Sequence, residues 1–225
     1  MRSRGVRTML RWSAVWMPLF LVAWLLDAAV YGAVLDEGAR DKDWTQVLRQ
    51  MGYLPTWVIA AVLLWLLDWK RTPPAHGLIS PGPERPWHHR GGLLLLSAIG
   101  AGLLANILKP LIGRLRPDEN GIAYFASRPA VLWAEGGPVG LGLPSGHTSV
   151  AFGACGMLAL LIPAWRWPMM ALAAGCAVTR LLAGAHTLSD TVAGAWVGLA
   201  VAAWLFAVGR GPRRGPAGGL VPREA

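Results

Sequence analysis

Long apolar runs separated by shorter polar segments make up most of this chain. Six of these runs reach or approach the roughly 20 apolar residues that a helix needs to cross a bilayer. They cover residues 12–35, 54–67, 91–108, 147–163, 167–182 and 188–208. The first run is interrupted only by Asp27 and is longer than the roughly 7–15 apolar residues of a cleavable signal peptide, so it is assigned as a membrane helix. The pattern predicts an all-α protein, an integral membrane six-helix bundle.

The segments between these runs are polar or rich in Gly and Pro and should lie outside the hydrocarbon. Residues 36–52 are expected to form a loop with a short surface helix at 44–51. The turns between the last three runs are short, which makes those helices antiparallel neighbours, and Gly194 and Gly198 offer a close-packing face. We expect one six-span membrane domain over residues 1–208 and a disordered cytoplasmic tail over residues 209–225.

The composition supports the membrane assignment. The chain has 225 residues, of which 54% are hydrophobic and only 15% are charged. A net charge of +9 would suggest nucleic-acid binding in a soluble chain, but here most Lys and Arg residues flank the apolar runs and act as topology signals. Their excess near both ends of the chain places the termini in the cytoplasm. In a bacterium, the protein would then lie in the inner (plasma) membrane.

Tryptophan and cysteine add further expectations. Several of the 13 Trp residues, including Trp57, Trp165 and Trp167, fall near the ends of apolar runs and are predicted to form an interfacial belt. Cys155 and Cys176 lie inside apolar runs without metal-ligand spacing. They should pack as small hydrophobic side chains.

Charged residues amid apolar sequence mark the first candidate for chemistry, at residues 179–190. This segment contains Arg180, His186 and Asp190. If it is helical from His186 onward, His186 and Asp190 lie on one face, so the carboxylate can hold one imidazole nitrogen and leave the other free to react. Arg180 offers a planar set of donors suited to phosphate. Considered alone, the segment could also be a structural polar cluster without chemistry.

A basic segment at residues 109–117 is predicted to lie at the same membrane face. Lys109 and Arg116 are seven residues apart, about two helical turns, so a helix continuing beyond Pro110 would direct both along one side. Arg114 lies between them as an auxiliary cation. Considered alone, this segment fits a face that is solvated or binds lipid headgroups.

The third segment, residues 144–147, lies at the start of the fourth run. Ser145 is a suitable N-cap, and Gly146 allows a ligand to approach the backbone closely. The free N–H groups of a helix start form an anion site, and His147 in that first turn can give or take a proton. The three segments together predict a phosphate-binding catalytic site.

The three segments also carry a family resemblance. Lys-x6-Arg-Pro, then Pro-Ser-Gly-His, then Arg-x5-His-x3-Asp resembles the type 2 phosphatidic acid phosphatase family of membrane enzymes, within the acid phosphatase–haloperoxidase superfamily. The motifs extend from Lys109 to Asp190, and Thr179 stands where many members have Ser. The resemblance implies a six-helix membrane bundle, a phosphohistidine intermediate, no metal or other cofactor, and lipid phosphate or lipid pyrophosphate substrates.

Carried over position by position, the resemblance also implies roles for individual residues. His186 becomes the nucleophile, Asp190 its orienting partner and His147 the general acid. The phosphate-binding residues are then Lys109, Arg116, Ser145, Gly146 and Arg180.

We therefore expect a membrane phosphohydrolase that cleaves a phosphate monoester or pyrophosphate from a lipid, with its active site facing the periplasm. Phosphatidic acid, phosphatidylglycerol phosphate, undecaprenyl pyrophosphate and lipid A phosphates all fit the motifs. Two alternatives stay open: a lipid phosphotransferase on the same fold, and a noncatalytic protein that binds or transports a lipid headgroup. The second alternative has no use for an oriented His-Asp pair with a second histidine.

Overall fold

The computed structural model describes residues 2–69, 89–117 and 140–209, and helices dominate these ranges. The long helices are α1 (Arg2–Val34), α3 (Leu54–Trp69), α4 (His89–Ile112), α6 (Gly146–Leu161), α7 (Arg166–Leu182) and α8 (Leu188–Gly209). The short ones are η1 (Glu37–Asp41), α2 (Asp43–Arg49), η2 (Gln50–Gly52) and η4 (Pro163–Trp165). Each predicted span is a helix, and the all-α assignment is confirmed. The predicted tail lies outside the described residues from residue 210 onward.

The described helices differ in their ability to cross a membrane alone. Three are long and apolar enough: Ala14–Val34 of α1, Arg90–Ile112 of α4, and α8. Together, α2, η2 and α3 form a further candidate that bends by 69°. Large apolar side chains such as Leu25, Leu67 and Leu103 are more than half exposed on α1, α3 and α4, as the outer surface of a lipid-embedded bundle requires. The chain is an integral membrane protein.

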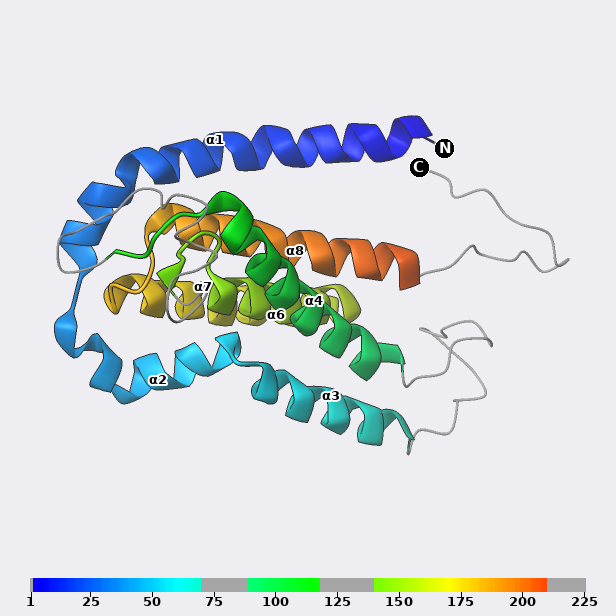
Figure 1. Ribbon diagram of the computed structural model, residues 1–225. Coiled ribbons are helices and arrows are strands. Elements are labelled where there is room, and N and C mark those ends of the chain that lie inside the picture. The colour runs from blue at the N-terminus through cyan, green and yellow to red at the C-terminus, as the bar shows by residue number, and fades with distance from the viewer. Residues whose placement is uncertain (1, 70–88, 118–139, 210–225) are drawn as a thin grey trace, which may run out of the picture.

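The helices run alongside one another, with α6 in the middle of the bundle (Figure 1). Helix α6 packs against α4, α7 and α8. The start of α1 and the end of α8 lie at one end of the molecule, whereas α2 and the turn between α7 and α8 lie at the other (Figure 1). This arrangement places the first turn of α6 at the same end as that turn.

Glycines allow α8 to approach α6 at backbone distance. A Cβ atom at Gly198 would lie 2.5 Å from the carbonyl oxygen of Ser149 and 2.6 Å from the nitrogen of Gly153. A Cβ atom at Gly194 would lie 2.7 Å from the carbonyl oxygen of Ser145. These distances are shorter than van der Waals contact, so the predicted close-packing face is confirmed.

Replacing Gly198 with alanine should destabilise the protein by about 1–3 kcal/mol, because the added methyl group forces α6 and α8 apart. The matched control is Gly92→Ala in α4, where nothing lies within 4 Å of the added atom. This control should be neutral or stabilising, because alanine is the better helix former. Thermal unfolding of both variants in detergent tests the contact, and equal midpoints would contradict it.

The end of α4 differs from the prediction. The helix continues past Pro110 and stops only before Gly113, whose φ of 74° turns the chain. Arg116 therefore lies in a non-helical segment whose backbone pairs with residues 140–142. The prediction that a continuing helix would align Lys109 with Arg116 is wrong, because glycine ends the helix first.

The tryptophans predicted to form the interfacial belt differ in their exposure. Trp165 and Trp167 are exposed, as predicted for an interfacial belt. Trp57 is only 3% exposed, and its indole nitrogen donates a 2.8 Å hydrogen bond to a main-chain carbonyl of η2. Its assignment to the belt is wrong, because the break between η2 and α3 offers that carbonyl as a partner. Cys155 and Cys176 are free and buried, as expected.

Candidate active site

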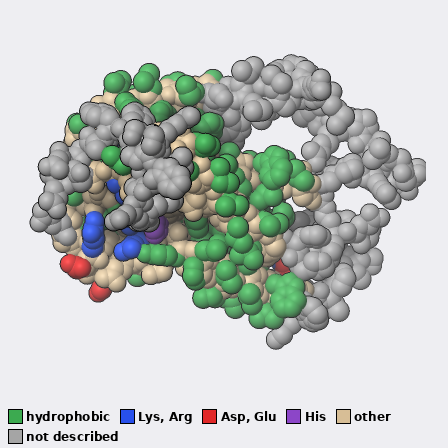
Figure 2. Space-filling view, viewed as in Figure 1, with side chains coloured by type: hydrophobic (Ala, Val, Ile, Leu, Met, Phe, Trp, Pro, Cys, Tyr) green, Lys and Arg blue, Asp and Glu red, His purple; other side chains and the backbone are tan. Residues whose placement is uncertain are grey.

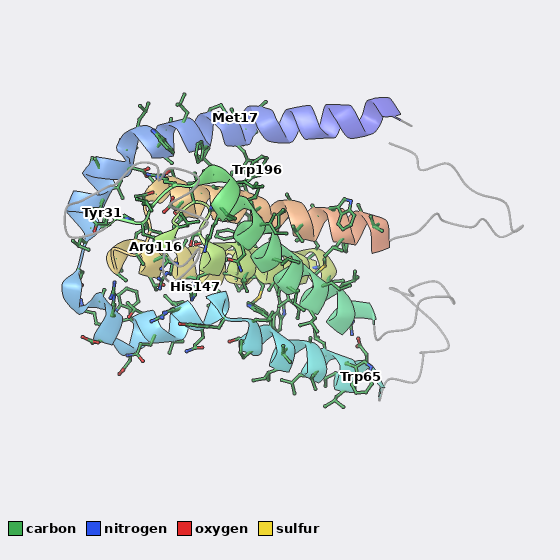
Figure 3. The ribbon with its side chains drawn as sticks, viewed as in Figure 1. Met17, Tyr31, Trp65, Arg116, His147 and Trp196 are labelled. Carbon is green, nitrogen blue, oxygen red and sulfur yellow. The ribbon has the colours of Figure 1, made fainter. Side chains whose placement is uncertain are left out.

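The three predicted segments meet at one end of the bundle. In Figure 3, the labelled Arg116 and His147 both lie toward that end. Figure 2 shows Lys and Arg side chains around a histidine at the same end of the molecule. Lys109, Arg180 and His186 all lie near enough to His147 to act on it electrostatically. The structure thus brings together the charged residues of segments that are far apart in the sequence.

His186 and Asp190 form a buried pair. Nδ1 of His186 lies 3.1 Å from Oδ2 of Asp190, and the two side chains are 1% and 0% exposed. His186 lies in the turn before α8 and not on the helix, so the predicted helical geometry is wrong. The contact still forms, because Asp190 reaches back over the helix start, where it also accepts a hydrogen bond from the N–H of Thr187 at 3.3 Å. The second ring nitrogen of His186, Nε2, takes no part in the contact with Asp190.

The surroundings of His186 favour its neutral form. Burial lowers the pKa of His186, because the charged imidazolium would lose its hydration. The hydrogen bond to Asp190 raises this pKa, but its effect is the smaller one. A neutral imidazole whose Nδ1 donates to the carboxylate has its lone pair on Nε2.

Arg114 and Asp27 support the other side of Asp190. Arg114 is 1% exposed and donates from Nη1 to Oδ1 of Asp190 at 3.3 Å and from Nη2 to Oδ2 of Asp27 at 2.7 Å. Asp27 also accepts hydrogen bonds from the backbone N–H of Ser189 at 2.8 Å and from its hydroxyl at 2.6 Å. The guanidinium lies over the ring of Trp24, with Cζ 4.3 Å from the centroid.

Sequence reasoning missed the partnership of Asp27 and underrated Arg114. Asp27 is on α1, 162 residues before Ser189 in the chain, so no local spacing connects the two. The signal was present, because a carboxylate inside a membrane helix is costly and needs a partner. Arg114 is not merely an auxiliary cation but joins Asp27 to Asp190.

Ser145 occupies the predicted N-cap of α6, but its side chain makes no capping hydrogen bond. Its hydroxyl oxygen instead accepts a 3.1 Å hydrogen bond from the hydroxyl of Thr148, and its backbone N–H donates to the carbonyl of Asp190 at 2.9 Å. Ser145 is therefore tied to the start of α8. The next residue, Gly146, faces Lys109, because a Cβ atom there would lie 3.5 Å from Nζ of Lys109.

His147 has one imidazole nitrogen without a partner. Within the part of the chain that the structure describes, its Nε2 is buried and accepts or donates no hydrogen bond. The ring of Tyr53 meets the imidazole edge-on at a centroid distance of 4.8 Å. Gly52 leaves the space for this ring, since a Cβ atom there would lie 2.6 Å from Cβ of His147. The packing holds His147 in place while Nε2 remains available.

The predicted phosphate-binding cations surround this end of α6. Arg180 is 7% exposed, and its Nε has no hydrogen-bond partner among the described residues. Arg116 donates from Nε to the carbonyl of Leu141 at 3.2 Å. Lys109 lies close enough to Arg116 and Arg180 to interact with both electrostatically. Like charges gathered in this way create a positive potential that favours an anion.

Two observations bear on the remaining predictions for this site. The hydroxyl of Thr179 donates to the carbonyl of Cys176 at 2.7 Å, so it bonds within its own helix. Among the described residues, no group of three or more His, Cys, Asp or Glu side chains could hold a metal ion. The groups of this site that suit an anion, among the described residues, are its cations and the first turn of α6.

Comparison with known proteins gives three relationships. The PAP2 superfamily matches residues 90–213. The lipid A 1-phosphatase of Rhizobium johnstonii is 36% identical over 115 residues, which are 51% of this chain and 44% of that protein. The lipid A 1-phosphatase of Rhizobium etli is 36% identical over 105 residues, 46% of this chain and 44% of that protein. The alignments thus span less than half the length of these curated relatives.

A solved structure adds a relationship of fold. The crystal structure of a transmembrane PAP2-type phosphatidylglycerolphosphate phosphatase from Bacillus subtilis overlays with a TM-score of 0.59. The overlay covers 89% of this chain and 97% of that one at 18% identity, so it shows a common fold alone. The superfamily match covers more than half of the chain and includes all three motifs. This chain belongs to the PAP2 superfamily.

Proposed function

We propose that the protein is a membrane phosphohydrolase that removes phosphate from a lipid through a phosphohistidine on His186. The observation that carries this proposal is the buried pair in which Nδ1 of His186 lies 3.1 Å from Asp190. The carboxylate fixes the tautomer and aims Nε2, as an orienting group does for an activated nucleophile. A protein that only binds or transports a headgroup has no need for this arrangement.

In the first step, Nε2 of neutral His186 attacks phosphorus, and the bond from phosphorus to the lipid oxygen breaks. Protonated His147 gives its proton to that leaving oxygen. Nδ1–H of His186 stays bound to Asp190, which stabilises the positive charge that develops on the ring. The lowered pKa of His186 supports this step, because the imidazole is neutral and has a free lone pair near pH 7.

In the second step, neutral His147 accepts a proton from water, and the resulting nucleophile attacks the phosphohistidine. The phosphorus–nitrogen bond breaks, phosphate leaves, and His186 returns to its neutral state. The unpartnered Nε2 of His147 supports both roles, because a proton carrier needs one nitrogen free to face substrate or water. Hydrolysis and transfer to another alcohol share the first step, so product analysis with and without an acceptor distinguishes them.

The cations supply the electrostatic part of the mechanism. Lys109, Arg116 and Arg180 would neutralise the equatorial phosphate oxygens. Ser145 and the N–H groups at Gly146 would bind the same phosphate and complete this cationic cradle. Removing one such donor from an enzyme typically costs about 10²–10³-fold in turnover. We propose that this cationic cradle replaces a metal ion.

Phosphate release from a panel of lipids tests the function. The names of the curated relatives make lipid A 1-phosphate the first substrate to assay, with phosphatidylglycerol phosphate, phosphatidic acid and undecaprenyl pyrophosphate beside it. We expect purified protein to release phosphate from at least one of them in excess EDTA. Loss of activity on chelation, restored by Mg²⁺, would overturn the metal-free mechanism. Absence of release from every lipid would overturn the function.

The site is proposed to face the periplasm, because the Arg-rich start of α1 lies at the opposite end of the molecule (Figure 1). Asp41→Cys in η1 and Ala164→Cys in η4 place exposed thiols at the site end and at the opposite end. A membrane-impermeant maleimide should label Asp41→Cys in intact spheroplasts and Ala164→Cys only after lysis. The native cysteines are buried and give the background signal. The reverse pattern would place the site in the cytoplasm.

A further inference from the structure

The two proposed catalytic histidines are oriented by different means. His186 is oriented by a carboxylate, because Oδ2 of Asp190 lies 3.1 Å from its Nδ1. His147 has no such partner for Nε2 among the described residues. The charged and titratable groups that act on its imidazole come from α7, α2, the turn before α8, and α4, and they are Arg180, Arg49, His186 and Lys109. None of these four groups is a carboxylate, so packing is what orients the ring of His147.

Gly52 and Tyr53 supply this packing where η2 ends and α3 begins. The ring of Tyr53 is perpendicular to the imidazole of His147, with an interplanar angle of 89° and a centroid distance of 4.8 Å. This is the T-shaped arrangement that pairs of aromatic rings prefer. A Cβ atom at Gly52 would lie 2.8 Å from Cδ2 of His147, so the main chain of η2 lies directly against the ring. Figure 3 shows His147 beside this part of the chain. Two adjacent residues thus restrict the rotation of the imidazole.

Tyr53 is itself held in place from the side of α2. Its backbone N–H donates to the carbonyl of Gln50 at 3.0 Å, which ties it to η2. Cζ of Arg49, at the end of α2, lies 5.4 Å from the centroid of the Tyr53 ring, within the range of a cation–π contact. A Cβ atom at Gly175 of α7 would lie 3.0 Å from the side chain of Leu48, so α2 lies directly on α7. The ring of Tyr53 is therefore a fixed contact and not a side chain on a free loop.

The orientation of His147 decides whether it can act as a general acid. A proton passes between heavy atoms that are about 2.6–3.2 Å apart, so a small rotation of the imidazole takes Nε2 out of reach of the leaving oxygen. The residues that restrict this rotation lie outside the three motifs and outside residues 90–213, which match the PAP2 superfamily. The motifs alone therefore do not reveal them.

We propose that Tyr53 is a positioning residue for the proton transfer from His147. Its ring, together with the backbone of Gly52, holds the imidazole in the orientation from which Nε2–H reaches the leaving oxygen. The bond from phosphorus to that oxygen breaks with its electron pair on oxygen, and the proton moves there from Nε2. Tyr53 acts only through His147. This inference rests on the proposed function for the roles of His147 and His186.

Two leaving groups of different basicity separate this role from a general effect on structure. A long-chain alkyl phosphate needs a proton to release its alcohol, whereas a nitrophenyl phosphate with a chain of the same length releases a stable phenolate without one. Rapid-quench measurements on the full-length protein in detergent give the rate at which each substrate forms the phosphohistidine. Tyr53→Leu should slow this step about 10–100-fold with the alkyl phosphate, which is part of the contribution of a general acid. The rate with the nitrophenyl phosphate should stay close to that of wild type.

Three further variants complete the test. Tyr53→Phe keeps the ring and should keep both rates near those of wild type. Gly52→Ala makes the test independent of the folding of Tyr53→Leu, because its methyl group would lie 2.6 Å from Cβ of His147 and displace the imidazole. This variant should also slow the reaction of the alkyl phosphate selectively. Trp167→Leu is the matched control, because it removes an exposed aromatic ring at the opposite end of α7, and it should change neither rate.

The outcomes separate the role of Tyr53 from the proposed function. Equal slowing of both substrates in Tyr53→Leu and Gly52→Ala would show a general structural effect and overturn the positioning role. Wild-type rates in both variants would overturn it as well. In either case, a phosphohistidine on the wild-type protein leaves the phosphohydrolase standing. If wild type forms no phosphoenzyme from either substrate, the proposed function falls, and the positioning role falls with it.

Discussion

Replacing His186 with alanine should abolish phosphate release while leaving the protein folded in the membrane. No other described imidazole is held by a buried carboxylate, and the charges of Arg116 and Arg180 act on this one. Removing the nucleophile of a covalent mechanism lowers turnover by at least about 10⁴-fold, because the remaining site can only orient water. Full activity of His186→Ala would remove the phosphohistidine from the mechanism.

The intermediate itself can be observed. Substrate carrying radiolabelled phosphate, quenched rapidly in alkaline detergent, should leave label on wild type and none on His186→Ala. The control is His147→Asn, which retains the nucleophile and should react about 10²–10⁴-fold more slowly, the range for loss of a general acid. Label on wild type that survives in His186→Ala would assign the intermediate to another residue.

Replacing Arg114 with methionine should destabilise the protein by about 3–5 kcal/mol, because it leaves two buried carboxylates without their cation. Asp27 and Asp190 are 4% and 0% exposed, so water cannot replace the lost partner. The repulsion between the carboxylates of Asp27 and Asp190, close to His186, should also reduce the activity of the variant protein that remains folded. Thermal unfolding in detergent measures the loss of stability.

The double variant Asp27→Asn/Arg114→Met provides the internal comparison. It removes one of the two uncompensated charges, and the introduced amide can still accept the hydrogen bond from the backbone of Ser189. We expect it to be more stable than Arg114→Met alone. Arg166→Met, which replaces an exposed arginine at the opposite end, should be neutral. Equal stability of Arg114→Met and Arg166→Met would show that the buried network contributes nothing to folding.

The sequence was sufficient to predict the helices because a bilayer permits few backbone conformations. A backbone in hydrocarbon must satisfy its own hydrogen bonds, so each long apolar run has to be a helix. The helix ends were less predictable. The third apolar run ends before Lys109, but a proline removes only one N–H from a helix, so α4 continues through Pro110 and the turn comes at Gly113. The spacing of His186 and Asp190 predicts a shared helix, but α8 begins only at Leu188.

The proximity of the three motifs could be predicted because topology assigns each of them to the same end of the bundle. The contacts of Asp27 and Arg49 could not, since both depend on helices packing across long stretches of sequence. Asp27 reaches Ser189 across 162 positions, and Arg49 lies at Cys176 across 127. Hydrophobic periodicity reports which face of a helix is apolar and says nothing about which distant helix lies against it.

The glycine contacts between α6 and α8 keep the spacing of the site residues independent of changes in the bilayer. His147 comes from α6, Asp190 from the start of α8 and His186 from the turn just before it, and the two helices touch through their backbones. The outer helix α3 exposes many of its large apolar side chains, so it experiences changes in lipid thickness and lateral pressure directly, whereas α1 is joined to the site through Asp27 and Arg114. Tilting of α3 about the 69° bend that joins it to η2 can absorb such changes while the two histidines keep their spacing. The reaction should therefore proceed at similar rates in thin and thick bilayers.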